Sequence, residues 1–291
     1  MRWKVGDVAI TSVSEMESIT SPRFLFADLD RSDVLRIVAT APWLQPHYVD
    51  DEGYLLQKIQ CLVIDTGDAR IAVDTCIGND KARNYPGWDH LQIPFLARLT
   101  AAGYPPESMT HVVCTHLHVD HVGWNTRLVD GQWVPTFPSA RYLFVEREYD
   151  HWRRAPDPDG CFDDSVAPIV AAGLADLVAG DHRLHDRVRL QPTPGHTPGH
   201  VSVVVTSGAA RAVITGDLLH TPIQMARVEL CSSFDTDPDE ARATRKAFLR
   251  SFADGTLVVG THFGTPSAGF VHSDGEGCWR LEPRFGQDAR P

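Results

Sequence analysis

The segment THLHVDHVG at residues 115–123 places four metal-capable side chains within six positions: His116, His118, Asp120 and His121. A short apolar run directly before the segment predicts a buried strand, and a glycine ends the segment, so we expect these side chains on a loop. Alternate positions of an extended chain point to one side, which pairs His116 with His118. Asp120 and His121 then follow one short turn further on. Imidazole nitrogens and a carboxylate oxygen are the ligands of catalytic zinc sites, so this loop can present ligands to two adjacent ions.

Length and charge restrict the class of protein. The 291 residues can bury a substantial core as one large domain or two small ones. No apolar run approaches the ~20 residues that a membrane-spanning helix needs, and the amino terminus turns polar too early for a secretion signal, which predicts a soluble, cytoplasmic protein. The net charge of -11 disfavours nucleic acid and anionic membranes. We therefore expect a small-molecule substrate, no nucleic-acid partner and no membrane partner.

The six cysteines include no Cys-x-x-Cys pair. Their scatter argues against a zinc ribbon and against a disulfide scaffold. They are expected to be reduced, mostly buried thiols without a catalytic role.

Short β-rich runs and helical patterns alternate along the chain. Residues 3–13 and 60–75 each predict a hairpin, and the other expected strands are 112–114, 141–145, 187–191, 201–206, 211–215 and 256–260. Helices are predicted at 92–103 and 237–252. This order predicts an α+β fold, an αββα sandwich of two mixed, mostly antiparallel sheets flanked by helices. No linker or internal repeat divides the chain, so residues 1–291 are predicted to form a single domain.

Residues 14–58 fit this plan poorly because they are apolar and rich in proline and aromatic residues without a regular period. Such a segment is interpreted as a lid over a pocket, a homodimer contact, or a meander packed on the core.

Three further motifs follow in the chain: TPGHTPGH at 193–200, TGD at 215–217 and GTHFG at 260–264. Together with the His-x-His-x-Asp-His pattern at 116–121 they resemble the metallo-β-lactamase superfamily. The resemblance extends from about residue 60 to residue 266.

This resemblance implies two zinc ions per chain, with Mn, Co or Fe as other possible metals. One ion would be held by His116, His118 and His196, the second by Asp120, His121 and His262, with Asp217 bridging the pair. A hydroxide between the ions would then be the nucleophile, oriented by Asp120, and the second ion would polarise the scissile carbonyl.

Two further residues are assigned by the resemblance to the surroundings of the metals. Asp74, in the AVDT stretch 72–75, resembles an early aspartate that supports the metal loop, although it also suits a turn at a strand end. In the repeated Pro-Gly-His, His196 is implied as the ligand and His200 as a supporting residue.

Residues adjacent to the expected ligands are candidates for the substrate pocket, each with core packing as its alternative: Trp124, Leu219, His220, Ile223 and Phe263. If several of them line a cavity, that cavity is broad and apolar. A lactone or carboxylic ester of a small, largely apolar molecule would suit it.

Seven metal ligands including a bridging aspartate resemble the lactonase and methyl parathion hydrolase-like branch of the superfamily more than the β-lactamases themselves. A phosphotriester hydrolase and a thioesterase on the same site stay open as alternatives, and an iron-dependent redox enzyme is a more distant one. A glutathione thioesterase is expected to carry a basic cluster, but the positive charges at 245–250 are interpreted as a solvated helix face.

Overall fold

The computed structural model describes residues 1–275 and 277–287. The chain divides into two compact units. Of the described residues, unit 1 comprises Met1–Glu15, Ile59–Gly180 and Gln287, and unit 2 comprises Met16–Lys58 and Asp181–Gly286. The single domain expected for residues 1–291 stays a prediction.

The first seven-stranded sheet has the order β1-β2-β3-β4-β5-β8-β9. Its strands are β1 (Arg2–Val5), β2 (Val8–Thr20), β3 (Leu55–Asp65), β4 (Arg70–Val73), β5 (His111–Val113), β8 (Arg141–Val145) and β9 (Ala175–Val178). The pairs β1–β2 and β3–β4 are antiparallel hairpins, and β4–β5, β5–β8 and β8–β9 are parallel. Both predicted hairpins are confirmed, and this sheet is mixed.

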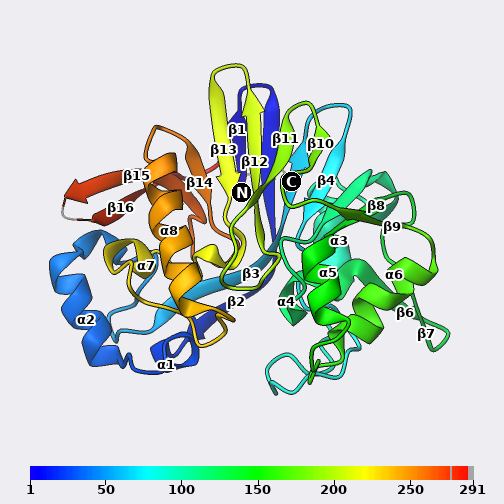
Figure 1. Cartoon of the computed structure of the whole chain (residues 1–291), viewed down its shortest axis with the longest axis horizontal. Helices are drawn as coiled ribbons and strands as arrows, with labels where there is room; N and C mark the ends of the chain where they lie inside the picture. Colours follow the sequence, from blue (N-terminus) through cyan, green and yellow to red (C-terminus); the bar gives the residue numbers. More distant parts are fainter. Residues whose placement is uncertain (276, 288–291) are drawn as a thin grey trace. The chain divides into compact units, whose positions relative to one another are not determined.

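Short helices and a small hairpin surround this sheet in unit 1. They are α3 (Phe95–Ala101), η2 (Pro106–Ser108), α4 (Val119–Val122), η3 (Gly123–Asn125), β6 (Thr126–Val129), β7 (Gln132–Pro135), α5 (Glu146–Trp152), the π-helical turn η4 (Phe162–Val166) and α6 (Ala167–Ala171). Helix α5 contacts β8 and β9 (Figure 1). The predicted helix at 92–103 is confirmed in its central part as α3.

The second seven-stranded sheet lies wholly in unit 2 and follows chain order from β10 to β16. Its strands are β10 (Arg183–His185), β11 (Val188–Pro192), β12 (Val201–Ser207), β13 (Ala210–Ile214), β14 (Leu257–Val259), β15 (Ala268–Gly275) and β16 (Cys278–Pro283). Only β13–β14 among its pairs is parallel. This sheet is therefore mixed and mostly antiparallel, as the sequence predicts.

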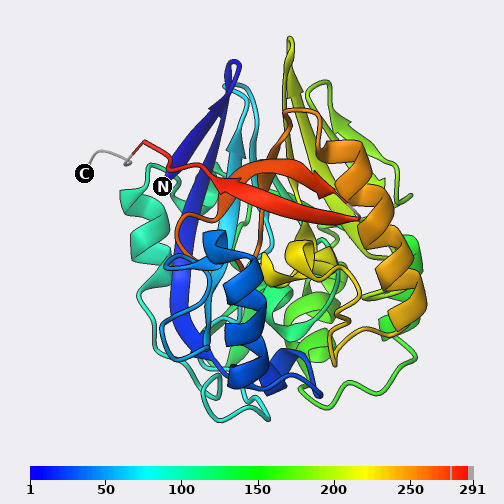
Figure 2. The ribbon, with the colours of Figure 1, turned by 90° about the vertical axis from the view of Figure 1, so that its left-hand side faces the viewer.

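Helices cover one side of the strands of unit 2. They are α1 (Pro22–Leu25), α2 (Arg31–Thr40), η1 (Pro42–Leu44), η5 (Gly216–Leu218), α7 (Ile223–Ala226) and α8 (Pro238–Phe252). Helix α7 contacts β16 and α8 contacts β15, an arrangement that can be followed in Figures 1 and 2. Asp237 caps α8 by accepting the backbone N–H groups of Asp239 and Glu240, as expected for the predicted helix start. Two mixed sheets with flanking helices confirm the predicted fold class.

The apolar segment 14–58 supplies much of the core of unit 2. Leu25, Val34, Leu44 and Tyr48 are buried in one cluster with the apolar face of α8. Helix α2 begins with a capping box at Asp30 and buries one apolar stripe. Packing on the core is thus what the structure shows for this segment, and a lid or dimer role stays a prediction.

Leu44→Ala is expected to lower the free energy of unfolding by about 2–5 kcal/mol, because Leu44 is fully buried and its removal leaves a cavity. Urea unfolding measures the change. The matched control is Leu35→Ala, since Leu35 lies on the same segment and is 38% exposed. Equal effects of the two substitutions would contradict a core role for residues 14–58.

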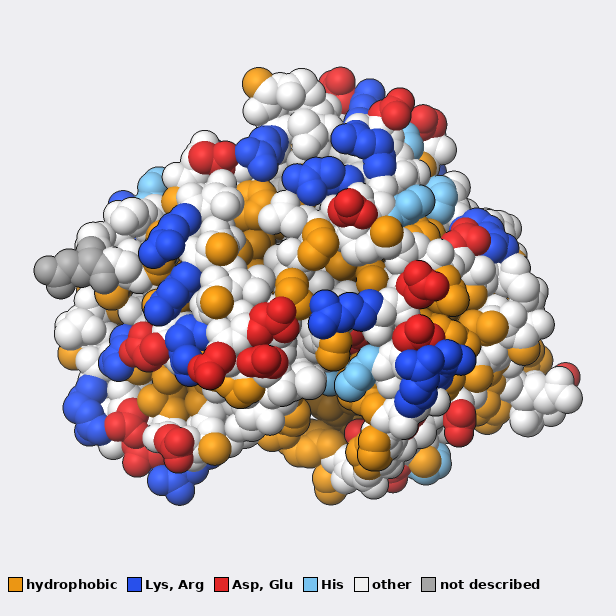
Figure 3. All heavy atoms as spheres, in the orientation of Figure 1, with side chains coloured by type: hydrophobic (Ala, Val, Ile, Leu, Met, Phe, Trp, Pro, Cys, Tyr) orange, Lys and Arg blue, Asp and Glu red, His pale blue; other side chains and the backbone are white. Residues whose placement is uncertain are grey.

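All six cysteines are free in the structure, and four of them are buried, which confirms the expectation of mostly buried thiols. Within the described residues, no helix has both the length and the hydropathy needed to cross a bilayer. Basic and acidic side chains are interspersed over the face of the molecule seen in Figure 3.

Candidate metal centre

Four of the predicted ligands lie together in unit 1, directly after β5. His116 Nε2 is 3.0 Å from His118 Nδ1, and the ring centroids of His116 and His121 are 4.0 Å apart. The single turn of α4 carries Asp120 and His121, and His121 Nε2 is 3.6 Å from Asp120 Oδ1. Three imidazoles and one carboxylate therefore converge within this unit.

Asp74 supports this cluster from the end of β4. Its carboxylate accepts the backbone N–H of Thr115 at 2.8 Å and the Thr115 hydroxyl at 2.9 Å, and it lies 2.9 Å from His121 Nδ1. The side chain is 1% exposed. Because Asp74 holds both the entry to the metal loop and one of its histidines, the geometry agrees with the supporting role that the resemblance implies.

Asp74→Ala is expected to weaken zinc binding by about 10–100-fold, the usual effect of removing a carboxylate behind a histidine ligand. Competition with a chromophoric chelator measures the affinity. Asp163→Ala is the control, because Asp163 is exposed on η4. Unchanged zinc affinity in a folded Asp74→Ala protein would show that Asp74 only caps a turn.

A buried glutamate that the sequence did not single out also orders the metal loop. Glu148, on α5, accepts the backbone N–H of Leu117 at 3.1 Å and the indole N–H of Trp152 at 2.6 Å. The Trp152 ring contacts His118 edge-on, with ring centroids 5.1 Å apart. Nothing in the local sequence distinguishes Glu148 from a surface glutamate, because its partner in the metal loop, Leu117, lies 31 residues away.

Trp124 was a candidate for the pocket wall, but the structure places it in the core of unit 1. Its ring stacks on Phe95 with centroids 5.5 Å apart, and its indole N–H donates to Glu15 at 2.6 Å. Glu15 also accepts the backbone N–H groups of Ile77 and Gly78, and burial raises the pKa of its carboxyl. Trp124 is 4% exposed and therefore anchors the metal loop by packing.

The other three predicted ligands lie in unit 2 around the carboxylate of Asp217. His196 Nε2 is 3.6 Å from Asp217 Oδ2, and His262 Nε2 is 3.1 Å from Asp217 Oδ1. All three side chains are nearly buried. The turn η5 holds Asp217 directly after β13, and His262 follows β14, so neighbouring parallel strands bring these two residues together.

The second ring nitrogen of each histidine in this group is held by the protein. His196 Nδ1 lies 2.9 Å from Asp235 Oδ1, and His262 Nδ1 lies 2.9 Å from the carbonyl oxygen of Lys58. A backbone carbonyl and an ionised carboxylate only accept hydrogen bonds, so these two contacts fit a proton on Nδ1 of both rings. The Nε2 lone pairs are thereby directed toward Asp217, the arrangement typical of metal-ligating histidines.

His200 differs from these ligands because the protein uses both of its ring nitrogens. Nε2 accepts the backbone N–H of Asp217 at 2.9 Å, and Nδ1 lies 2.9 Å from Thr193 Oγ1. No lone pair remains for a metal in this arrangement. His200 therefore fixes the backbone that carries Asp217, as expected of a supporting residue.

His220, a candidate for the pocket, belongs to the same cluster as the ligands of unit 2. The ligand atoms of His196, Asp217 and His220 lie within 4.8 Å of one another, and His220 Nε2 is 3.3 Å from Asp217 Oδ2. Neither ring nitrogen of His220 has a hydrogen-bond partner among the described residues. In the sequence, the one feature that points to His220 is its place three residues after Asp217.

The remaining pocket candidates are core residues. Leu219, Ile223 and Phe263 are fully buried in the apolar cluster of unit 2. Their burial agrees with the core-packing alternative, and a place in the pocket wall stays a prediction.

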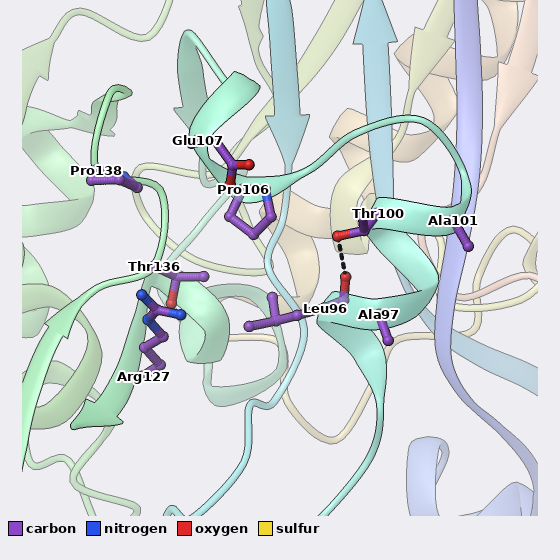
Figure 4. A pocket seen from close by; sticks show the side chains of 9 residues that line it. All are labelled: Leu96, Ala97, Thr100, Ala101, Pro106, Glu107, Arg127, Thr136 and Pro138. Carbon is purple, nitrogen blue, oxygen red and sulfur yellow. Dashed lines mark hydrogen bonds between the residues drawn. The ribbon is translucent and has the colours of Figure 1, made fainter. Parts of the chain in front are cut away.

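A surface cavity of about 580 Å³ lies elsewhere in unit 1 (Figure 4). Its lining residues come from α3, η2 and the β6–β7 region: Leu96, Ala97, Thr100, Ala101, Pro106, Glu107, Arg127, Thr136 and Pro138. None of them is a predicted ligand or pocket residue, so this cavity is separate from the donor clusters.

The donor sets fit divalent metal ions. Each unit on its own gathers imidazoles and a carboxylate. His196 and His262 hydrogen-bond a supporting oxygen through one nitrogen and direct the other toward Asp217, and His121 Nδ1 lies 2.9 Å from Asp74. Histidine nitrogen with carboxylate oxygen is a ligand set that suits zinc and, with less preference, other transition metals. Such a set binds a Lewis acid and can orient water.

Comparisons with known proteins agree with this chemistry. The family model of the metallo-beta-lactamase superfamily matches residues 57–273. The metallo-beta-lactamase domain-containing protein 1 of Xenopus laevis is 30% identical over 208 residues, which are 71% of this chain and 73% of that protein. An N-acyl homoserine lactonase of Bacillus sp is 25% identical over 200 residues, which are 64% of this chain and 74% of the lactonase.

Solved structures show the same fold over nearly the whole chain. The hydrolase AbOPH of the beta lactamase superfamily has a TM-score of 0.80 at 25% identity, and the match covers 99% of this chain and 98% of that one. AidC, a dizinc quorum-quenching lactonase in complex with a product, has a TM-score of 0.78 at 20% identity with the same coverage. The family model, the relative from Xenopus laevis and the shared fold together establish that this chain belongs to the metallo-beta-lactamase superfamily.

Proposed function

We propose that this protein is a dinuclear zinc hydrolase that opens a lactone or cleaves a carboxylic ester of a small substrate. The observation that carries the proposal is the set of seven donors. In this set, Nδ1 of His196 and of His262 is hydrogen-bonded to a supporting oxygen, and Nδ1 of His121 lies 2.9 Å from the Asp74 carboxylate. Buried imidazoles whose second nitrogen is bound by a protein oxygen are characteristic of metal sites. Membership of the metallo-beta-lactamase superfamily also supports a metal-dependent hydrolase.

The proposed assignment gives one zinc to His116, His118 and His196 and the other to Asp120, His121 and His262, with Asp217 shared. Zinc held by these residues would supply a hydroxide nucleophile at neutral pH and a Lewis acid for the carbonyl oxygen. The role of Asp120 is to orient the attacking oxygen and accept its proton. Asp74, Asp235 and the Lys58 carbonyl keep the histidines in the tautomer that ligation requires.

The substrate class is inferred from relatives and from charge. Curated relatives and solved neighbours include N-acyl homoserine lactonases, which act on a cyclic ester. The net charge of -11 disfavours polyanionic substrates. The burial of Trp124, Leu219, Ile223 and Phe263 agrees with core packing, so the preference for an apolar substrate is inferred here from the lactonase relatives.

A substrate panel tests this proposal. Zinc-loaded protein is assayed with N-acyl homoserine lactones, simple lactones, aryl esters, thioesters and phosphotriesters. The highest kcat/KM is expected among the lactones and carboxylic esters, with turnover lost after chelation and regained on adding zinc. Turnover confined to phosphotriesters or thioesters would contradict the lactone or ester assignment while leaving the metal centre in place.

A further inference from the structure

Arg245 is a buried charge on α8 that the proposed chemistry does not use. The sequence predicts residues 245–250 as a solvated helix face, and for Arg245 this prediction is wrong, since the residue is 0% exposed. Its guanidinium donates from Nε to the carbonyl of Leu218 at 3.1 Å, and from Nη1 to the carbonyls of Val228 and Leu230 at 2.9 and 2.7 Å. Buried guanidinium groups are rare and need a partner of opposite charge.

That partner is Asp235. Arg245 Nη2 lies 3.8 Å from Asp235 Oδ2, and the same oxygen accepts the backbone N–H of Ser232 at 2.9 Å. The other oxygen, Oδ1, lies 2.9 Å from Nδ1 of His196. The Asp235 side chain is fully buried, so these groups account for both of its oxygens without solvent.

The backbone around Asp235 is attached to the backbone around His196. Thr236 N–H donates to the carbonyl of His196, and Asp237 N–H donates to the carbonyl of Gly195, both at 2.9 Å. A Cβ at position 195 would lie 2.2 Å from the backbone nitrogen of Ala241, so only glycine lets α8 approach this closely. The position of His196 is therefore coupled to the start of α8 and to the loop before it.

We propose that Asp235 and Arg245 are positioning residues for the metal ligands of unit 2. Asp235 holds His196 with the proton on Nδ1 and the lone pair on Nε2, and Arg245 holds Asp235 in place. Arg245 also binds the carbonyl of Leu218, the residue next to Asp217, so one guanidinium orients the surroundings of two ligands. This inference rests on the proposed function, because it treats His196 and Asp217 as ligands.

Zinc affinity of full-length variants tests this inference. Asp235→Ala and Arg245→Met are compared with wild-type protein by competition with a chromophoric chelator, and Co²⁺-substituted protein reports the coordination by its visible spectrum. One of two zinc ions is expected to bind about 10–100-fold more weakly in both variants, with an altered Co²⁺ spectrum. Asp235→Asn, which keeps an acceptor for Nδ1–H, is expected to recover part of the affinity.

The matched control is Arg250→Met, which removes an exposed arginine from the same helix and is expected to leave both zinc ions at wild-type affinity. Folded Asp235→Ala and Arg245→Met proteins that bind two zinc ions as tightly as wild type would overturn the inference and leave the proposed function standing. Wild-type protein that binds no zinc would instead contradict the proposed function.

A second measurement tests the inference on wild-type protein, so it does not depend on whether the Asp235 and Arg245 variants fold. In metal-free wild-type protein, ¹⁵N NMR of the histidine rings is expected to show His196 protonated on Nδ1, with the signal assigned by its loss in His196→Gln. A His196 ring protonated on Nε2 would overturn the inference independently of any metal.

Discussion

Replacing Asp120 by asparagine is expected to lower kcat/KM by more than about 100-fold while the fold survives. The loss should exceed the 10–100-fold effect of removing a supporting residue, since Asp120 is proposed both as a metal ligand and as the group that orients the attacking oxygen. His118→Ala should give a loss of the same order. Steady-state kinetics on the best substrate of the panel measure both.

Two surface substitutions control for this experiment. Asp163→Asn and His90→Ala change the same residue types at exposed positions and are expected to retain wild-type turnover. Circular dichroism and thermal unfolding establish that the variants are folded. If Asp120→Asn and His118→Ala both keep substantial activity, the site is misassigned.

Gly123→Ala is expected to lower the free energy of unfolding by about 3 kcal/mol or more, which is a large effect for one added methyl group. A Cβ at this position would lie 1.7 Å from the carbonyl oxygen of Ile77, a backbone atom that Glu15 helps to hold through the adjacent N–H groups. The backbone φ of Gly123 is -60°, so the cost comes from the clash alone. Urea unfolding measures it.

Gly103→Ala separates this clash from backbone strain. Gly103 has a φ of 94°, and an added Cβ would meet no heavy atom within 4 Å. Gly103→Ala is expected to lower the free energy of unfolding by about 1–2 kcal/mol, because alanine disfavours the left-handed backbone conformation. A Gly123→Ala protein as stable as the Gly103→Ala control would contradict the close packing of the metal loop on residues 77–78.

The parts of the fold that the sequence predicts are those determined by neighbouring residues. The strand expected at 141–145 is β8 without a shift, and the acidic, proline-containing start at Asp237 begins α8. The donors at 116–121 were equally recognisable, because a single loop carries all four. Local pattern and local chemistry agree in these segments.

The parts that were missed depend on distant partners. Glu148 and Asp235 have no local signature, since their roles come from Leu117 and His196 respectively. The irregular composition of residues 14–58 concealed the amphipathic helix α2, whose apolar stripe faces the core of unit 2.

Arg245 is a missed residue for which a signal was present. Helix α8 buries Ala241, Arg245, Phe248 and Phe252, positions separated by three or four residues. The arginine thus occupies the apolar stripe of the helix, where a charge is expected to have a buried partner. The neighbouring basic residues Lys246 and Arg250 mask this periodicity in the sequence.

The metal content of the purified full-length protein tests the central claim most directly. Elemental analysis after removal of loosely bound ions should give about two zinc ions per chain, falling to about one or fewer in Asp217→Ala, whose carboxylate is proposed to be shared. Wild-type protein that takes up no divalent metal, or that carries stoichiometric iron with redox activity and no hydrolysis, would contradict the account.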